Sequence, residues 1–221
     1  MLDVVAQITE GTAFDKHGRP FRRRNYIPGA AMIACLAVAA LLVWVIALSR
    51  PPEVPQAAIC NRPPPPAQPG APVPDLGEQV SRSTMIDVTP AKLADAKIRV
   101  LNASGQGGQA AEVAGALRDI GFTEPEAAND PIYETARLQC VGQIRFGPSG
   151  RAAAASVWLV APCMELFQDG RADDTVDLAI GTDFTELTHS DDIDAVLASL
   201  LPDATGPADP DLLTQAHTGT C

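Results

Sequence analysis

Residues 98–122 read IRVLNASGQGGQAAEVAGALRDIGF, and this stretch decides how the folded part of the chain is built. Its apolar first residues predict a strand over 97–102. After a glycine-rich turn, apolar residues recur at helical spacing, which predicts a helix over 108–120. Gly121 stands where a glycine commonly ends a helix. The stretch therefore predicts a strand, a tight turn and a helix in succession.

A glycine-rich turn between a strand and a helix is also the form of a phosphate-binding loop. The glycines here, Gly105, Gly107 and Gly108, give G-x-G-G-x-A and not the G-x-G-x-x-G of dinucleotide-binding loops. No lysine occurs in 98–221, so the lysine of a P-loop is missing as well. We therefore expect the turn to join strand and helix closely, and we expect no cofactor to bind there.

The elements that follow repeat this pattern in outline. The apolar run over 151–162 predicts a buried helix, although SVWLV within it would also fit a strand, and the polar residues 165–174 are expected to form a loop. The predicted elements are strands at 97–102, 122–128, 141–147 and 175–181 and helices at 108–120, 151–162 and 190–202. This order, β-α-β-β-α-β-α, is typical of a small α+β domain of the split β-α-β type, with its core over 97–201.

The N-terminal part of the chain carries an apolar run, residues 27–48, that contains no charge. At 1.5 Å per residue such a helix spans roughly 33 Å, which is enough for a bilayer core of about 30 Å. FRRRN precedes the run and only Arg50 follows it, so the positive-inside rule predicts that the tail 1–26 is cytoplasmic and that the chain after Arg50 is outside. The run is also longer than the apolar region of a cleaved signal peptide. We expect an uncleaved, single-pass anchor in the cell membrane.

The part of the chain after the anchor divides into a spacer and a domain. Residues 51–75 form a proline-rich linker, which is expected to be extended because proline fixes φ and removes amide donors. Residues 76–221 are expected to form the extracytoplasmic domain. Residues 51–221 hold 24 Asp and Glu against 10 Lys and Arg, a net charge of −14. Such an acidic body argues against binding to nucleic acid.

The five cysteines fit an oxidising compartment outside the membrane. Cys35 lies in the apolar run, where it is most simply a small apolar residue. The other four are predicted to lie outside, which suggests two disulfides, and four cysteines allow three pairings. Of these we favour Cys140–Cys163 together with Cys60–Cys221.

The sequence offers no convincing set of catalytic or metal-binding residues. G-x-S-x-G does not occur, and Ser104, Ser149 and Ser156 have no evident histidine partner. CxxC is absent as well, and His17, His189 and His217 are scattered, which argues against zinc. The acidic stretch DGRADD at 169–174 lacks the spacing of an EF-hand. We expect no catalytic, cofactor-binding or metal-binding residue.

Three stretches, at 98–122, 143–160 and 176–184, resemble the LytR C-terminal domain family. In that family a V-x-N-x-[ST]-G turn leads into an alanine-rich helix that ends in GF, a second strand leads into a G-P-x-x-x-x-A-A helix, and a last strand ends in a G-x-D turn. The matching residues here are Val100, Asn102, Ser104 and Gly105; Gly121 and Phe122; Gly147, Pro148, Ala152 and Ala153; and Gly181 and Asp183. Many members join this domain to a catalytic domain that transfers glycopolymers to peptidoglycan, whereas here the proline-rich linker leads almost directly into the small domain.

The whole chain also resembles a family of actinobacterial cell-envelope integrity proteins. The stretches that carry this resemblance are 5–25, 76–83, 142–147, 158–163 and 171–187, with the closing Cys221. It implies a single-pass protein that helps to keep the envelope intact and supports survival in a host, and it transfers no catalytic residue. We therefore expect a non-enzymatic protein whose outer domain binds peptidoglycan, a wall glycopolymer or an envelope protein. The alternative is an accessory to, or an enzyme of, wall glycopolymer transfer.

Overall fold

The computed structural model describes residues 27–49, 59–65, 73–206 and 208–218. The chain divides into two compact units, Met1–Glu53 and Val54–Cys221. Within the first unit the structure describes helix α2, Ile27–Ser49. Its residues Ile27–Val45 form the one helix in the described ranges that is long and apolar enough to cross a membrane, as the sequence predicts. The predicted cytoplasmic tail lies outside the described residues.

The second unit is built on one mixed sheet of six strands in the order β1-β5-β4-β6-β2-β3. Strand β2 is parallel to both of its neighbours, β3 and β6, whereas β4 is antiparallel to β6 and parallel to β5, and the edge strand β1 is antiparallel to β5. The strands are β1 Glu78–Val80, β2 Ile98–Asn102, β3 Glu126–Asn129, β4 Gly142–Phe146, β5 Glu165–Gln168 and β6 Val176–Ile180. Mixed pairing of this kind, with helices between the strands, confirms the predicted α+β class.

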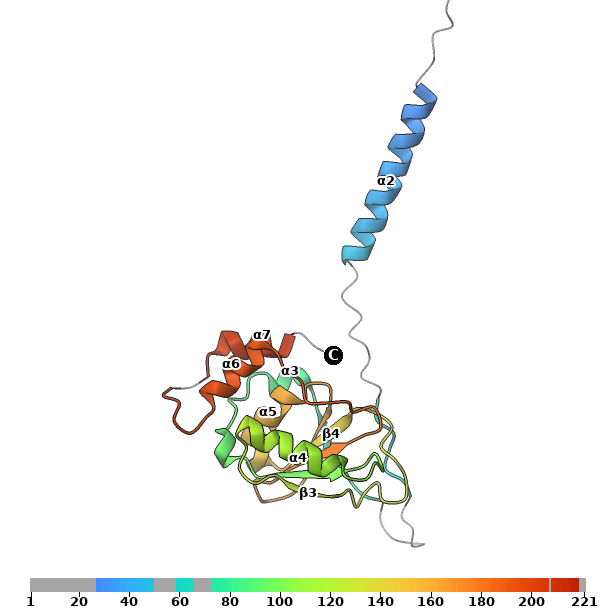
Figure 1. The fold of residues 1–221 in the computed structure, drawn as a ribbon. Coiled ribbons are helices and arrows are strands. Elements are labelled where there is room, and N and C mark those ends of the chain that lie inside the picture. Colours follow the sequence, from blue (N-terminus) through green and yellow to red (C-terminus); the bar gives the residue numbers. More distant parts are fainter. Residues whose placement is uncertain (1–26, 50–58, 66–72, 207, 219–221) are drawn as a thin grey trace, which may run out of the picture. The chain divides into compact units, whose positions relative to one another are not determined.

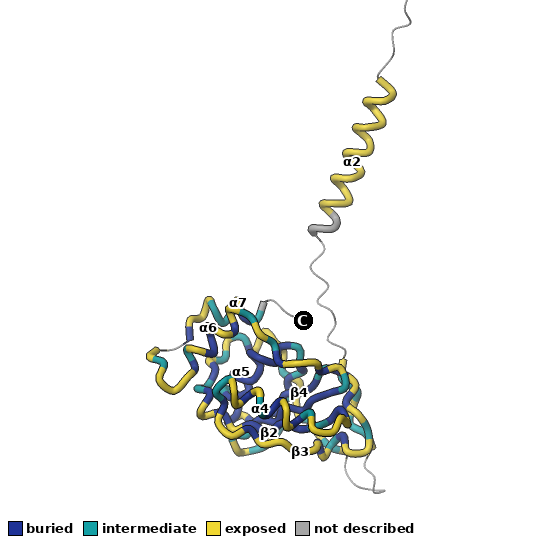
Figure 2. Tube along the Cα trace, in the orientation of Figure 1, coloured by how far each residue is buried: buried dark blue, intermediate teal, exposed yellow. Residues whose placement is uncertain are grey.

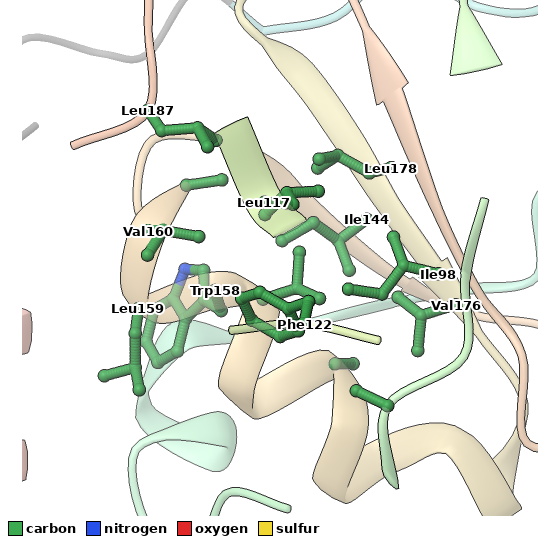
Figure 3. Close-up of a cluster of buried hydrophobic side chains, with 14 of the residues drawn as sticks. Ile98, Leu117, Phe122, Ile144, Trp158, Leu159, Val160, Val176, Leu178 and Leu187 are labelled. Atoms are coloured by element: carbon green, nitrogen blue, oxygen red, sulfur yellow. The ribbon is translucent and has the colours of Figure 1, made fainter. Parts of the chain in front are cut away.

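The helices pack on one face of this sheet and bury its larger core. Side chains alternate along a strand, so Val100, Ile144 and Leu178 from adjacent strands all point to the same face. Figure 3 shows part of this core, where strand side chains lie beside Leu117 and Trp158 of the helices. The helical elements are α3 Arg82–Met85, the 3₁₀ turn η1 Leu93–Asp95, α4 Gln109–Ile120, the 3₁₀ turn η2 Pro148–Gly150, α5 Arg151–Val160, α6 Asp191–Ser199 and α7 Pro210–Thr218.

The opposite face of the sheet buries a smaller core of its own. Leu101 and Ala179 point to this face, next to Tyr133, Leu138 and Cys140. The cover comes from the connection 130–141 and from residues 59–65, which we call the strap, because its Cys60 packs on this core. Figure 2 accordingly shows the central strands as buried, whereas β3 at the edge is exposed. The sheet is thus covered on both faces in its middle, although helices lie on only one of them.

Most of the predicted elements are present, and the exceptions are short. The segment 151–162 is helical, as α5, so the strand alternative for SVWLV is wrong. The loop predicted over 165–174 is wrong at its start, because β5 is an interior strand there. Only Leu166 in it points into the larger core, and one apolar position gives no periodic signal. Strand β1 is three residues long and gives no periodic signal either.

Candidate functional site: a polar pocket beside the glycine-rich turn

The turn after β2 is held by the side chain of Asn102. Its Oδ1 accepts hydrogen bonds from the Ser104 hydroxyl at 3.0 Å and from the Gly105 amide at 3.1 Å, and its Nδ2 donates to the Gln106 carbonyl at 2.6 Å. Gly105 and Gly108 adopt φ of +77° and +87°, which favours glycine at both positions. Asn102 therefore makes the local contacts that turn a strand into a helix.

Ser104 is the serine of the family motif, and its hydroxyl hydrogen-bonds within the turn. The side chain is buried, and its oxygen lies 3.0 Å from Asn102 Oδ1 and 2.5 Å from Gln109 Oε1. The same oxygen accepts a hydrogen bond from the Gln106 amide at 3.1 Å. A hydroxyl has one proton to donate, and both of its acceptors here are neutral amide oxygens, which are poor bases. The geometry is that of a locked turn and not of an activated nucleophile.

A pocket of about 410 Å³ opens beside this turn, at the carboxyl ends of the parallel strands β2 and β3. We call it the turn pocket. Three of its side chains, Asn129, Thr135 and Arg137, offer an amide, a hydroxyl and a guanidinium, and none of them makes a side-chain hydrogen bond within the described part of the chain. Its lining consists of Asn102, Gly105, Gly107, Asn129, Asp130, Tyr133, Glu134, Thr135, Ala136 and Arg137.

A buried ion pair stands at the base of the turn pocket. Asp130 and Arg145 are 1% and 2% exposed, and Arg145 Nη2 lies 2.9 Å from Asp130 Oδ2. Asp130 Oδ1 accepts from the Ile132 amide at 2.7 Å, and Arg145 donates from Nε and Nη2 to Gln143 Oε1 at 3.1 and 2.8 Å. Each charge therefore has a charged and a neutral partner, although Asp130 Oδ2 makes no hydrogen bond besides this ion contact within the described residues. The pairing compensates for part of the cost of burial.

Tyr133 connects this ion pair to the strap. Its ring lies 5.6 Å from the Arg145 guanidinium carbon, and its hydroxyl donates to the Asn61 carbonyl at 2.7 Å. Burial raises the pKa of the Tyr133 phenol, and the charge of Arg145 offsets only part of this rise. The phenol therefore stays protonated and acts as a hydrogen-bond donor.

A disulfide between Cys60 and Cys140 fixes the strap on the smaller core. Asn61 adds two hydrogen bonds, from its Nδ2 to the Arg137 carbonyl at 3.1 Å and from the Gln139 amide to its Oδ1 at 2.6 Å. The strap thus holds the segment 137–140, which includes Arg137 of the turn pocket. This part of the proline-rich linker packs against the domain.

Both disulfides that we favoured from the sequence are wrong, because Cys140–Cys163 and Cys60–Cys221 each need a cysteine that the Cys60–Cys140 bond already uses. The sequence signal misled because residues 51–75 have the composition of a spacer, and nothing in them predicts contact with the segment before β4. Cys163 is also disulfide-bonded, and Cys221 lies outside the described residues. Cys35 on α2 is free, as expected.

The other candidate residues do not come together in a reactive site. Asp169 pairs with Arg171 and Asp174 pairs with Lys97. His189 lies in a different pocket, beside Glu112 and Phe184, and His217 packs in α7 against Trp158. In the described ranges no group of three or more His, Cys, Asp and Glu side chains could hold a metal ion.

The sequence reasoning missed the turn pocket and the ion pair below it. The one usable signal was Arg145, a lone charge within the otherwise apolar strand GQIRFG. A charge in a buried strand requires a partner, and that partner, Asp130, comes from a connection with no periodic pattern. Asn129, Thr135 and Arg137 lie in or beside the same connection.

Comparisons with known proteins place the chain among relatives. The family model described as LytR cell envelope-related transcriptional attenuator, a LytR C-terminal domain, matches residues 95–184, a range that contains the whole turn pocket. The cell envelope integrity protein Cei of Mycobacterium tuberculosis (strain ATCC 25618 / H37Rv) is 64% identical over 218 residues, which covers 99% of this chain and 100% of that protein. The crystal structure of the soluble domain of a conserved hypothetical secreted protein from Mycobacterium marinum matches with 67% identity and a TM-score of 0.65. This match covers 67% of this chain and 100% of the solved chain.

Proposed function

This chain belongs to the family of the cell envelope integrity protein Cei, and from that premise we propose that it is a membrane-anchored, non-enzymatic protein that contributes to envelope integrity by binding through its outer domain. Helix α2 is the single span, the tail before it is cytoplasmic, and the sheet domain lies on the outer side of the membrane. By keeping the envelope intact, the protein supports survival in a host.

The disulfide supports this orientation. Cys60–Cys140 lies on the carboxyl side of α2, and disulfides persist in oxidising compartments and are rare in the cytosol. The arginines that precede α2 favour the cytoplasmic side for the N-terminal tail. Two independent features, charge and oxidation state, thus favour the same topology.

The proposal of binding rests on which side chains at the turn pocket already have hydrogen-bond partners within the domain and which do not. The Ser104 hydroxyl beside the pocket and the Asp130 carboxylate in its lining are buried and held by partners within the domain. The groups that remain available are the amide, hydroxyl and guanidinium of Asn129, Thr135 and Arg137, together with the exposed carboxylate of Glu134. Polar groups of this kind fix the orientation of a bound ligand, and binding is therefore the role that we propose for the pocket.

The same groups favour a polyhydroxylated ligand. Amide, hydroxyl and guanidinium donors match the hydroxyl groups of a sugar, and a volume of about 410 Å³ lies within the range of small-ligand pockets. We therefore propose peptidoglycan or a wall glycopolymer as the bound component. An envelope protein that inserts a polar loop into the pocket is the alternative partner.

Sedimentation with purified, insoluble cell-wall material tests this proposal. Full-length protein in detergent should co-sediment with the wall, and Arg137→Ala combined with Asn129→Ala should weaken binding by about 10-fold or more, since each lost hydrogen bond to a ligand costs about 1–2 kcal/mol. Arg118→Ala on the exposed surface of α4 is the matched control, and it should bind like the parent.

Three results would each contradict one part of this proposal. Equal binding by the pocket variant and the parent would remove the pocket from the proposal. Absence of wall binding, with capture of an envelope protein at the pocket, would favour the protein partner. A chemical change in the glycopolymer during incubation, lost in the pocket variant, would favour a role in glycopolymer transfer.

A further inference from the structure

Helix α7 docks on the domain through a histidine that stacks on a tryptophan. The rings of His217 and Trp158 have their centroids 4.0 Å apart and their planes 21° apart. Ala216 beside it is buried, and Leu212 and Leu213 pack against the larger core. The C-terminal helix therefore covers one side of Trp158.

Trp158 is held in place on its own helix. Its indole Nε1 donates to the Pro162 carbonyl at 3.2 Å, and the same carbonyl accepts a hydrogen bond from Arg82. The Arg82 guanidinium carbon lies 5.8 Å from the centre of the Trp158 ring. A positive charge is thus fixed close to the aromatic surface on which His217 stacks.

Among the described residues, the surroundings of His217 offer no group that would stabilise an imidazolium. Its Nδ1 is buried and has no hydrogen-bond partner within the described part of the chain. Of the elements around it, α3 contributes Arg82, α5 contributes Trp158, which does not titrate, and α6 and α7 carry acids only in their first turns. These acids are Asp191, Asp192 and Asp194 on α6 and Asp211 on α7.

Two effects therefore oppose protonation of the docked ring. Burial, and after it the positive charge of Arg82, lower the pKa of His217 to about 4 from an ordinary value of 6.5. When α7 leaves Trp158, both effects are removed and the imidazole titrates normally. Between pH 6.5 and about 4 the undocked state thus binds more protons than the docked state, so acidification favours undocking.

We propose that the His217–Trp158 stack makes the docking of α7 sensitive to acid, so that α7 releases Trp158 as the surroundings of the outer domain acidify. We call this contact between His217 and Trp158 the latch. Well above pH 6.5 the imidazole is neutral in both states and α7 stays docked. At pH 5 the docking equilibrium is weakened by at most about 30-fold relative to neutral pH, and partial exposure of the ring reduces this to about 10-fold.

Tryptophan fluorescence of the full chain in detergent tests this latch. The chain has two tryptophans, so Trp44→Phe leaves Trp158 as the reporter. Titration from pH 7.5 to 4.5 should shift its emission to longer wavelength as the indole loses its cover. His217→Phe keeps an aromatic ring on Trp158 without a titrating nitrogen, and its emission should stay constant over this range.

The second described histidine provides the matched control. His189 is exposed and lies in another pocket, so His189→Gln should titrate like the parent. Hydrogen exchange of the parent provides a second reading that does not depend on whether His217→Phe is docked at pH 7.5. Protection of amides 211–218, corrected for intrinsic exchange, should fall about 10-fold between pH 7.5 and 5. The proposal would be overturned if amide protection in α7 did not change with pH. It would also be overturned if a docked His217→Phe variant showed the same pH-dependent emission shift as the parent.

Discussion

Asp130 and Arg145 are the two buried charges on which the cover of the smaller core depends. The two charges pair with each other inside the domain, and Tyr133 and Gln143 lie next to Arg145. Removing one partner of such a pair is costly, because the other charge stays buried without compensation. The pair therefore specifies how the connection 130–141 lies on the sheet, and with it the shape of the turn pocket.

The first prediction follows from this pair. Asp130→Asn keeps the size of the side chain but leaves Arg145 as an unpaired buried cation, so the free energy of unfolding should fall by about 3–5 kcal/mol. Urea denaturation followed by Trp158 fluorescence measures it. Asp174→Asn, in an exposed pair with Lys97, is the control and should leave the urea midpoint unchanged. An equally stable Asp130→Asn variant would contradict the role given to the pair.

A substitution of Ser104 distinguishes a structural role of the glycine-rich turn from a catalytic role. Ser104→Ala removes a buried hydroxyl that accepts a hydrogen bond from the Gln106 amide and has its one proton to donate to Asn102 Oδ1 or Gln109 Oε1. The free energy of unfolding should therefore fall by about 1–3 kcal/mol. Envelope integrity in complemented cells should decline only in proportion to that loss. Exposed Ser149→Ala should match the parent in both measurements. A fully stable Ser104→Ala variant that is inactive in cells would indicate catalysis.

Helix α4 is the element whose position matters most for the turn pocket, since it begins where the glycine-rich turn ends. Its carboxyl end is set by Gly121, which has φ of +117°. A Cβ atom at this position would lie 2.9 Å from Leu201 Cδ2. The backbone therefore requires glycine there, whereas the packing requires only that the exposed end of Leu201 move.

A pair of glycine substitutions in this helix tests that requirement. Gly121→Ala should lower the free energy of unfolding by about 1–3 kcal/mol, because the native φ is unfavourable for alanine and Leu201 must move. Gly115→Ala, in the interior of the same helix with open space around it, should raise stability by about 0.5–1 kcal/mol. Thermal unfolding of both variants measures the difference, and the same sign for both would refute the assignment.

The sequence was most informative for elements with a periodic apolar face. The helices α4, α5 and α6 and the strands β2, β4 and β6 could all be placed because several of their side chains enter one core. Strand β5 could not, since tertiary pairing and not its own pattern makes it a strand. The turn pocket was missed for a related reason: its side chains come from irregular segments that only the buried ion pair and the strap bring together.

For the whole molecule, the disulfide Cys60–Cys140 is a covalent link between the strap, which follows helix α2 in the sequence, and the sheet domain. It joins residues 80 positions apart in the sequence and holds the strap over the smaller core. Cross-links over long loops restrict the unfolded chain strongly. Stability of the outer domain therefore depends on an oxidising compartment, in agreement with the proposed topology.

Cysteine substitutions test this link. Cys60→Ser and Cys140→Ser should each lower the free energy of unfolding by about 2–4 kcal/mol, and the double variant should lose little more than either single one, because all three lack the same bond. Urea denaturation provides the comparison, with Cys35→Ser in α2 as the control that should match the parent. Additive losses in the double variant would show that the two cysteines act independently.

Photocrosslinking in living cells tests most directly whether the turn pocket holds an envelope component. A photoreactive residue replaces Thr135 in the pocket or Arg118 on α4 of the full-length protein, and each version must first restore envelope integrity in cells that lack the parent. The account predicts that position 135 crosslinks to wall polymer, that Arg137→Ala abolishes this crosslink, and that position 118 gives none. A functional protein that crosslinks from position 118 but never from position 135 would contradict it.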